Sequence, residues 1–96
     1  MLNPMEYEGY KTVYKRYDGF DNTNASAYYI NLTSHLKTDL NVSEILAVTL
    51  ANWGGVVSNN NPVSIAYYPS SDTLQCLFVP HTFTNGYVEV LVFCKI

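Results

Sequence analysis

Charged side chains are scarce in this chain: they make up 14% of its 96 residues, well below the rough quarter that is usual for globular domains. Five Lys and Arg stand against eight Asp and Glu, which gives a formal net charge of −3. Binding to nucleic acid or to an anionic lipid surface normally requires a basic patch. The composition therefore predicts neither of them as a partner.

Long apolar runs are absent as well. No stretch approaches the 18 or more apolar residues of a membrane span, and the N-terminus has neither the basic start nor the apolar run of a signal peptide. We therefore expect no membrane insertion and no export through a signal peptide.

Groups that carry out chemistry are few and scattered. The chain has two histidines, His35 and His81, and its carboxylates lie mostly in turns, whereas catalysis needs ionisable groups that converge. Cys76 and Cys94 alternate with apolar residues, which is typical of buried thiols, although a disulfide between neighbouring strands stays possible. Neither the cysteine spacing nor the turn at Gly19 supplies a metal-ligand set. We expect no enzyme, no metal and no cofactor.

What the chain does have is a hydrophobic pattern of period two, interrupted by clusters of Asn, Gly, Ser and Pro. This pattern predicts an all-β fold. Residues 1–9 are interpreted as a connector and residues 10–96 as one domain, with a loop or short helix between Thr33 and Ser43. Six strands are expected, at Tyr10–Tyr17, Tyr28–Leu32, Ile45–Trp53, Val63–Tyr68, Thr73–Val79 and Tyr87–Ile96.

The alternation also predicts the buried faces. The last strand has a second face that is apolar in its middle, at Leu91 and Phe93, so another surface should cover it. Its first face should point into the core and consists of Val88, Val90, Val92, Cys94 and Ile96.

Two further features of the pattern concern the middle and the end of the chain. Leu46, Val48 and Leu50 fall on one face of a central strand. Asn85-Gly86 is a tight-turn signal, which predicts a terminal hairpin between the last two strands.

Recognition groups are better supplied than catalytic ones. Nine tyrosines accompany many Asn and Ser residues, a composition that suits binding loops. Trp53 and the loop Asn59-Asn60-Asn61 offer an aromatic ring and amides close in sequence, as a sugar ligand requires. Tyr68 begins a second polar loop, at the opposite end if these strands form a meander. The alternative is that Trp53 closes the end of the core and the Asn-rich loop is only a turn.

Four segments resemble a known group of proteins: ILAVTLANW, PVSIAYY, DTLQCLFVP and YVEVLVFCKI, within Glu44 to Ile96. Together they resemble the C-terminal tail-fibre, baseplate and receptor-binding domains of tailed phages that infect Gram-positive bacteria. The resemblance implies a small antiparallel β-sandwich, jelly-roll-like, that forms a homotrimer in the virion and contacts a cell-wall saccharide or another virion protein.

The resulting hypothesis is a phage attachment domain, assembled in the host cytoplasm, that binds host-surface carbohydrate without catalysis. Its alternatives are a structural virion protein without a free ligand, such as a capsid fibre, decoration or baseplate connector, and a lectin-like module. The expected subunit interface comprises Leu91, Phe93, Tyr10 and Tyr14, and the expected ligand contacts are Trp53, Asn59, Asn60, Asn61 and Tyr68.

Overall fold

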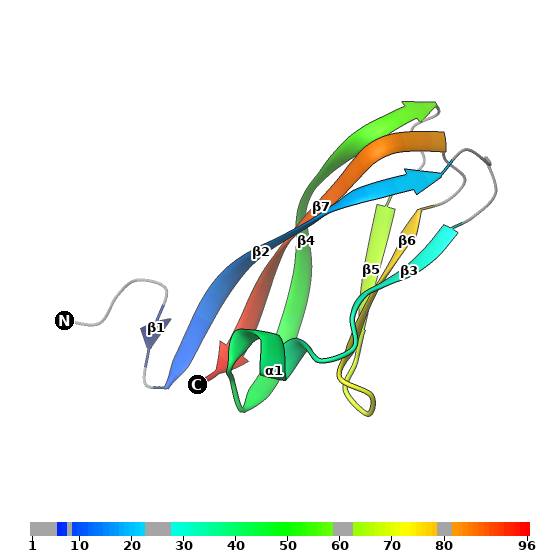
Figure 1. The fold of residues 1–96 in the computed structure, drawn as a ribbon. Helices are drawn as coiled ribbons and strands as arrows, with labels where there is room; N and C mark the ends of the chain where they lie inside the picture. Colours follow the sequence, from blue (N-terminus) through cyan, green and yellow to red (C-terminus); the bar gives the residue numbers. More distant parts are fainter. Residues whose placement is uncertain (1–5, 8, 23–27, 59–62, 79–81) are drawn as a thin grey trace.

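The chain forms two antiparallel sheets packed face to face in a computed structural model that describes residues 6, 7, 9–22, 28–58, 63–78 and 82–96 (Figure 1). The expected all-β sandwich is therefore confirmed. Six long strands lie where the alternation predicts them, and a two-residue strand precedes them in the segment interpreted as a connector. The elements are β1 (Glu6–Tyr7), β2 (Tyr10–Asn22), β3 (Tyr28–Thr33), α1 (Leu36–Leu40), β4 (Glu44–Ser58), β5 (Val63–Tyr68), β6 (Thr73–Phe78) and β7 (Thr82–Lys95).

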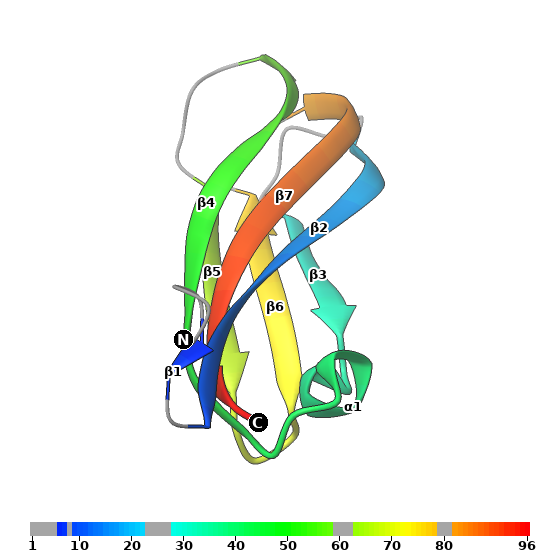
Figure 2. The ribbon, with the colours of Figure 1, turned by 90° about the vertical axis from the view of Figure 1, so that its left-hand side faces the viewer.

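The strand order explains the jelly-roll character of the fold. One sheet has the order β1-β2-β7-β4 and the other has the order β3-β6-β5. From β2 onward, each connection crosses between the sheets except the hairpin from β5 to β6, which is the wrapping pattern of a jelly roll with few strands. Figure 2 shows β2, β7 and β4 crossing in front of the three-stranded sheet.

The core lies between the sheets and is centred on β7. The alternation is confirmed along most of this strand, because four of the five expected core residues are fully buried; Ile96 is the exception and is 57% exposed. It follows the end of β7, and its backbone N–H donates to the carbonyl oxygen of Gly9. The buried residues are Val88, Val90, Val92 and Cys94 of β7, Leu74 and Cys76 of β6, Val63 of β5 and Leu36 of α1.

In β4 the expected face is partly wrong, because the strand is bulged. Val48 and Leu50 pack against the core, but Leu46 is 50% exposed. The pairing with β7 shifts register after Ile45 and again after Leu50. Each shift adds one residue that the partner strand does not match, so the inward row runs through Ile45, Val48, Leu50 and Trp53 rather than through every second residue.

The expected terminal hairpin is wrong. β6 and β7 belong to different sheets, and Asn85-Gly86 lies inside β7 rather than between two paired strands. Asn85 has a φ of 52°, and its N–H donates to the Asp21 carboxylate at 2.9 Å. A residue that tolerates the left-handed region serves a strand irregularity as well as a turn, so the dipeptide alone does not distinguish them.

The segment between β3 and β4 contains a short helix that closes one end of the sandwich (Figure 1). Leu36 enters the core, and the turn between β5 and β6 holds the start of the helix. Both carboxylate oxygens of Asp72 accept the Lys37 N–H at 3.1 Å, and one also accepts the Tyr67 hydroxyl at 2.6 Å. Asp72 therefore joins the helix to the three-stranded sheet.

Candidate functional site

The expected ligand-binding residues are not brought together in the described part of the chain. Trp53 is half-buried in β4 and packs against the cluster of Val63, Cys76 and Val88. Tyr68 is 46% exposed on the outer face of the three-stranded sheet, at the end of β5. Residues 59–61 lie outside the described residues. Trp53 and Tyr68 thus belong to different sheets and different surfaces.

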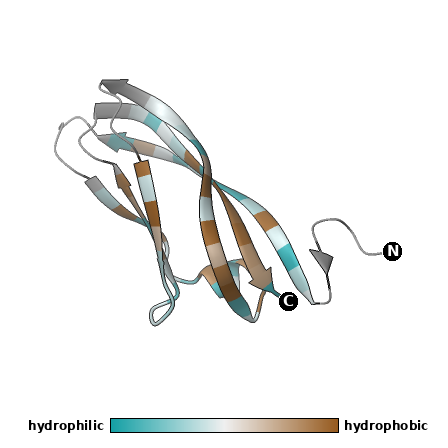
Figure 3. Cartoon of the chain, turned by 180° about the vertical axis from the view of Figure 1, so that it is seen from behind, coloured by the Kyte–Doolittle hydropathy of each residue, from teal (hydrophilic) through white to brown (hydrophobic). Residues whose placement is uncertain are grey.

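The four residues expected at a subunit interface do share one surface. Tyr10, Tyr14, Leu91 and Phe93 all lie on the outer face of the four-stranded sheet, where Tyr14 is directly opposite Leu91. We call these four residues the apolar patch. Tyr14 is 52% exposed and Phe93 is 38% exposed. Figure 3 shows that apolar residues are also frequent along β4 near the end where α1 lies.

A polar cluster borders this patch and is centred on Glu89. Its carboxylate accepts the Tyr14 hydroxyl and the Asn52 side-chain amide, the latter at 3.2 Å. Arg16 lies 3.9 Å from the same carboxylate, and its guanidinium stacks on the Tyr87 ring at 4.1 Å. The outer face of this sheet is therefore half apolar and half charged.

The outer face of the three-stranded sheet is different, and we call it the tyrosine–amide face. Tyr29 and Tyr68 are 61% and 46% exposed on the two edge strands. Between them the Tyr68 hydroxyl donates to Gln75 at 3.3 Å, and the Gln75 amide donates to Asn31 at 3.2 Å. Ala66 lies directly opposite Gln75 on the third strand. None of these side chains is charged.

Of the residues on this face, the sequence singled out Tyr68 but not Tyr29, Asn31 or Gln75. The sequence does contain a signal for Tyr29 and Asn31, because they are two residues apart in a predicted strand and must share a face. Their proximity to Gln75 depends on the pairing of β3 with β6. The sequence instead predicts that β6 pairs with the last strand.

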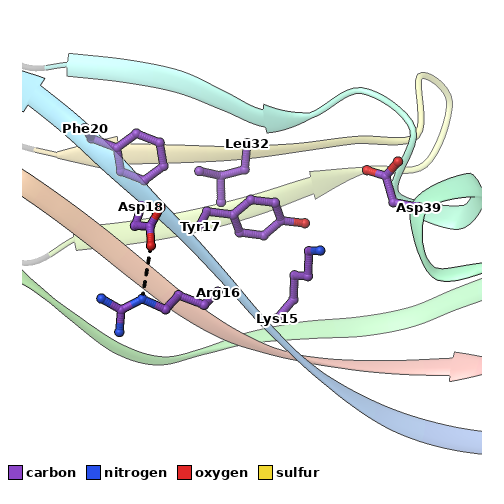
Figure 4. A pocket seen from close by; sticks show the side chains of 7 residues that line it. All are labelled: Lys15, Arg16, Tyr17, Asp18, Phe20, Leu32 and Asp39. Carbon is purple, nitrogen blue, oxygen red and sulfur yellow. Dashed lines mark hydrogen bonds and ion pairs between the residues drawn. The ribbon is translucent and has the colours of Figure 1, made fainter.

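A hollow lies at the open side of the sandwich, between the edge strand β3 and the part of β2 that β1 does not cover (Figure 4). We call it the seam pocket. Its volume is about 590 Å³, within the usual range for ligand sites. The residues around it come from β2, β3 and α1 and are Lys15, Arg16, Tyr17, Asp18, Phe20, Leu32 and Asp39.

Tyr17 is the unusual member of this pocket. Its hydroxyl oxygen is buried and has no hydrogen-bond partner in the described part of the chain. Burial, and secondly the negative charge of Asp39, raise the pKa of Tyr17 to about 12. The hydroxyl therefore stays protonated at physiological pH and remains an unused donor.

The two thiols are enclosed. Cys76 and Cys94 are free and buried, as expected, and burial raises the pKa of Cys76 to about 12. Within the described ranges, no group of three His, Cys, Asp or Glu side chains lies together in a way that could hold a metal ion. No helix in those ranges is long and apolar enough to cross a membrane.

The chain matches no protein-family model, and neither the curated proteins nor the solved structures contain a match to it.

Proposed function

We propose that this chain is a non-enzymatic attachment domain of a tailed-phage virion, and that it binds host-surface carbohydrate as a homotrimer. The observation that carries the carbohydrate proposal is the tyrosine–amide face, which has one exposed tyrosine ring on each side of a row of amides. Sugars combine apolar ring faces with hydroxyl groups, so flat aromatic rings and amides are suitable partners for them.

The amides of this face are already oriented. Gln75 is held from both sides, by the Tyr68 hydroxyl and by Asn31. Groups that are fixed before binding lose less conformational entropy when the ligand arrives. The second N–H of Gln75 and the side-chain N–H groups of Asn31 are left to donate to ligand hydroxyls.

The spacing of the two rings indicates an extended ligand. Tyr29 of β3 pairs with Leu77 of β6, and Leu77 pairs with Ser64 of β5. Tyr68 lies four residues beyond Ser64 on β5. At ordinary strand spacings the two backbone positions are roughly 17 Å apart. A ligand that contacts both rings must therefore span several sugar units.

The apolar patch supports the homotrimer part of the proposal. Exposed aromatic and aliphatic side chains that lie together are typical of subunit contacts. Three copies would then present three tyrosine–amide faces to one cell surface, and multivalency would strengthen weak binding at each of them.

The first experiment measures binding of soluble oligosaccharides from cell walls of Gram-positive bacteria to the isolated chain, by isothermal calorimetry. Replacing both rings, by Tyr29→Ala with Tyr68→Ala, should weaken binding at least 30-fold, since stacking on each ring contributes about 1 kcal/mol or more. Leu46→Ala is the control, because Leu46 is a 50% exposed apolar side chain on the other sheet and lies outside the apolar patch.

Equal affinity of the double variant and the wild-type chain would contradict the tyrosine–amide face as the carbohydrate site. The absence of any saccharide binding, together with a stable trimer, would favour the second candidate function. That candidate is a structural virion protein whose faces contact only other virion proteins, and the contiguous apolar patch is the observation that favours it.

A further inference from the structure

The seam pocket has no role in the function proposed above, and its side chains are arranged unusually. Along β2, Val13, Lys15 and Tyr17 are half-buried, whereas Tyr14 and Arg16 are exposed. Lys15 therefore lies in the row that faces the other sheet, with Val13 and Tyr17 on either side. A charged side chain on such a face needs polar partners or solvent, and the open side of the sandwich provides the space.

The polar groups in the pocket are largely unused. The Lys15 ammonium is 5.9 Å from the centre of the Tyr17 ring, and it makes no ion pair with any residue in the described ranges. The Tyr17 hydroxyl is buried without a partner in those ranges. Asp39 accepts a hydrogen bond from the Thr33 hydroxyl through one oxygen, so its other oxygen can still accept one.

These groups define the chemistry of a ligand. Lys15 and Tyr17 offer donors and Asp39 offers an acceptor, while Phe20 and Leu32 supply apolar surface. A hydroxyl group both donates and accepts, so neighbouring hydroxyls can satisfy an ammonium and a carboxylate together. The formal charges around the pocket also cancel, because two basic and two acidic side chains line it.

We propose that the seam pocket binds one neutral sugar ring, with Lys15 and Tyr17 donating to its hydroxyls, Asp39 accepting from them, and Phe20 and Leu32 contacting its apolar face. This site is separate from the tyrosine–amide face. It rests on the proposed function only for the source of the sugar, which would be a terminal or branching unit of a surface glycan.

The test is an NMR titration of ¹⁵N-labelled protein with glucose, galactose and N-acetylglucosamine, and with glucuronate and galacturonate as their acidic counterparts. At least one neutral sugar should shift the amide signals of Lys15, Tyr17 and Asp39. Tyr17→Phe should raise its dissociation constant about fivefold to tenfold, and Lys15→Met should raise it more than tenfold. The matched controls Tyr10→Phe and Lys95→Met lie on the outer face, away from the seam pocket, and should leave the dissociation constant of the monosaccharide unchanged.

Misfolding is not an explanation for a loss of binding in Tyr17→Phe, since that change removes a buried hydroxyl without a partner and should keep or raise the melting temperature. Binding of the uronates alone would overturn the proposal in favour of an anion site, and so would signal shifts that avoid the pocket. Loss of oligosaccharide binding in the double tyrosine variant, with monosaccharide binding intact, would show that the tyrosine–amide face and the seam pocket bind independently.

Discussion

The outer faces of the two sheets share one arrangement of three residues. On the four-stranded sheet, Glu89 of the central strand accepts the hydroxyl of Tyr14 from one neighbouring strand and the amide of Asn52 from the other. On the three-stranded sheet, the same places are taken by Gln75, Tyr68 and Asn31.

The difference between a carboxylate and an amide at the centre decides the character of each face. A carboxylate only accepts hydrogen bonds, and Glu89 has a guanidinium nearby, that of Arg16. An amide donates as well as accepts, so Gln75 is satisfied by neutral neighbours and keeps one donor for a ligand. The charged face, which adjoins the apolar patch, therefore suits a fixed protein contact, whereas the neutral face suits a reversible polar ligand.

The largest expected effect concerns the apolar patch on the four-stranded sheet. Phe93→Lys places a charge in the apolar patch and should dissociate the proposed homotrimer, so that the mass measured by light scattering falls from about three times 10.8 kDa to 10.8 kDa. Phe93 is partly exposed, so the monomer should stay folded. Tyr29→Lys on the tyrosine–amide face is the control and should leave the mass unchanged. A wild-type chain that is monomeric at all concentrations would contradict the homotrimer.

The next effect concerns how the three-stranded sheet is anchored. Asp72→Ala removes the acceptor of both the Lys37 N–H and the Tyr67 hydroxyl, and it should lower the free energy of unfolding by about 2 kcal/mol. Urea unfolding measures this loss.

Asp18→Ala is the matched control for that measurement, because Asp18 is exposed and pairs only with Arg16 at 3.4 Å among the described residues. It should cost less than about 0.5 kcal/mol. Similar losses in both variants would mean that the helix is held chiefly by Leu36.

A third prediction concerns two tyrosines that face inward rather than outward. Burial is the main cause that raises the pKa values of Tyr17 and Tyr67 to about 12, with the charge of Asp39 and the hydrogen bond to Asp72 as the further causes. In the unfolded chain a phenol ionises near pH 10, so the folded state holds these protons more tightly. Their contribution to stability is complete below pH 10 and is lost as the pH rises through 12.

Urea unfolding at intervals from pH 9 to pH 12 should therefore show a falling free energy of unfolding. Tyr17→Phe and Tyr67→Phe should each make the decline shallower. A decline that is unchanged in both variants would assign the alkaline transition to other groups.

The sequence predicts the fold far better than it predicts the positions of side chains in bulged strands. Alternation suffices for β7, where Val88, Val90 and Val92 fill the core without interruption. It fails at Leu46, because a bulge is a property of two paired strands. The turn signal at Asn85-Gly86 fails for the same reason, since neighbouring strands decide whether a left-handed residue turns the chain or bulges it.

The candidate sites also differ in whether they depend on one strand or on the pairing of several elements. Leu91 and Phe93 can be grouped from the sequence because they lie on one predicted strand face, whereas their closeness to Tyr10 and Tyr14 depends on the pairing of β7 with β2. The seam pocket could not be, because Lys15 and Asp39 meet only through crossings between the sheets. Tyr17 packs against the core cluster, whereas Tyr14 of the same strand lies on the outer face.

The smallest expected effect comes from exchanging Glu and Gln at the centres of the two outer faces. Glu89→Gln replaces charge-assisted hydrogen bonds by neutral ones and should lower the free energy of unfolding by about 0.5–1 kcal/mol. Raising the salt concentration from 50 to 500 mM should destabilise the wild-type chain more than this variant, because salt screens the pair of Glu89 with Arg16. Gln75→Glu adds a carboxylate to a face without charge, so raising the salt concentration should destabilise this variant less than the wild-type chain. It should also weaken oligosaccharide binding, because the amide donors of Gln75 are lost. If both variants keep the salt response of the wild-type chain, the charge at the centre of each sheet does not set the character of its face, and the apolar patch alone distinguishes the two surfaces.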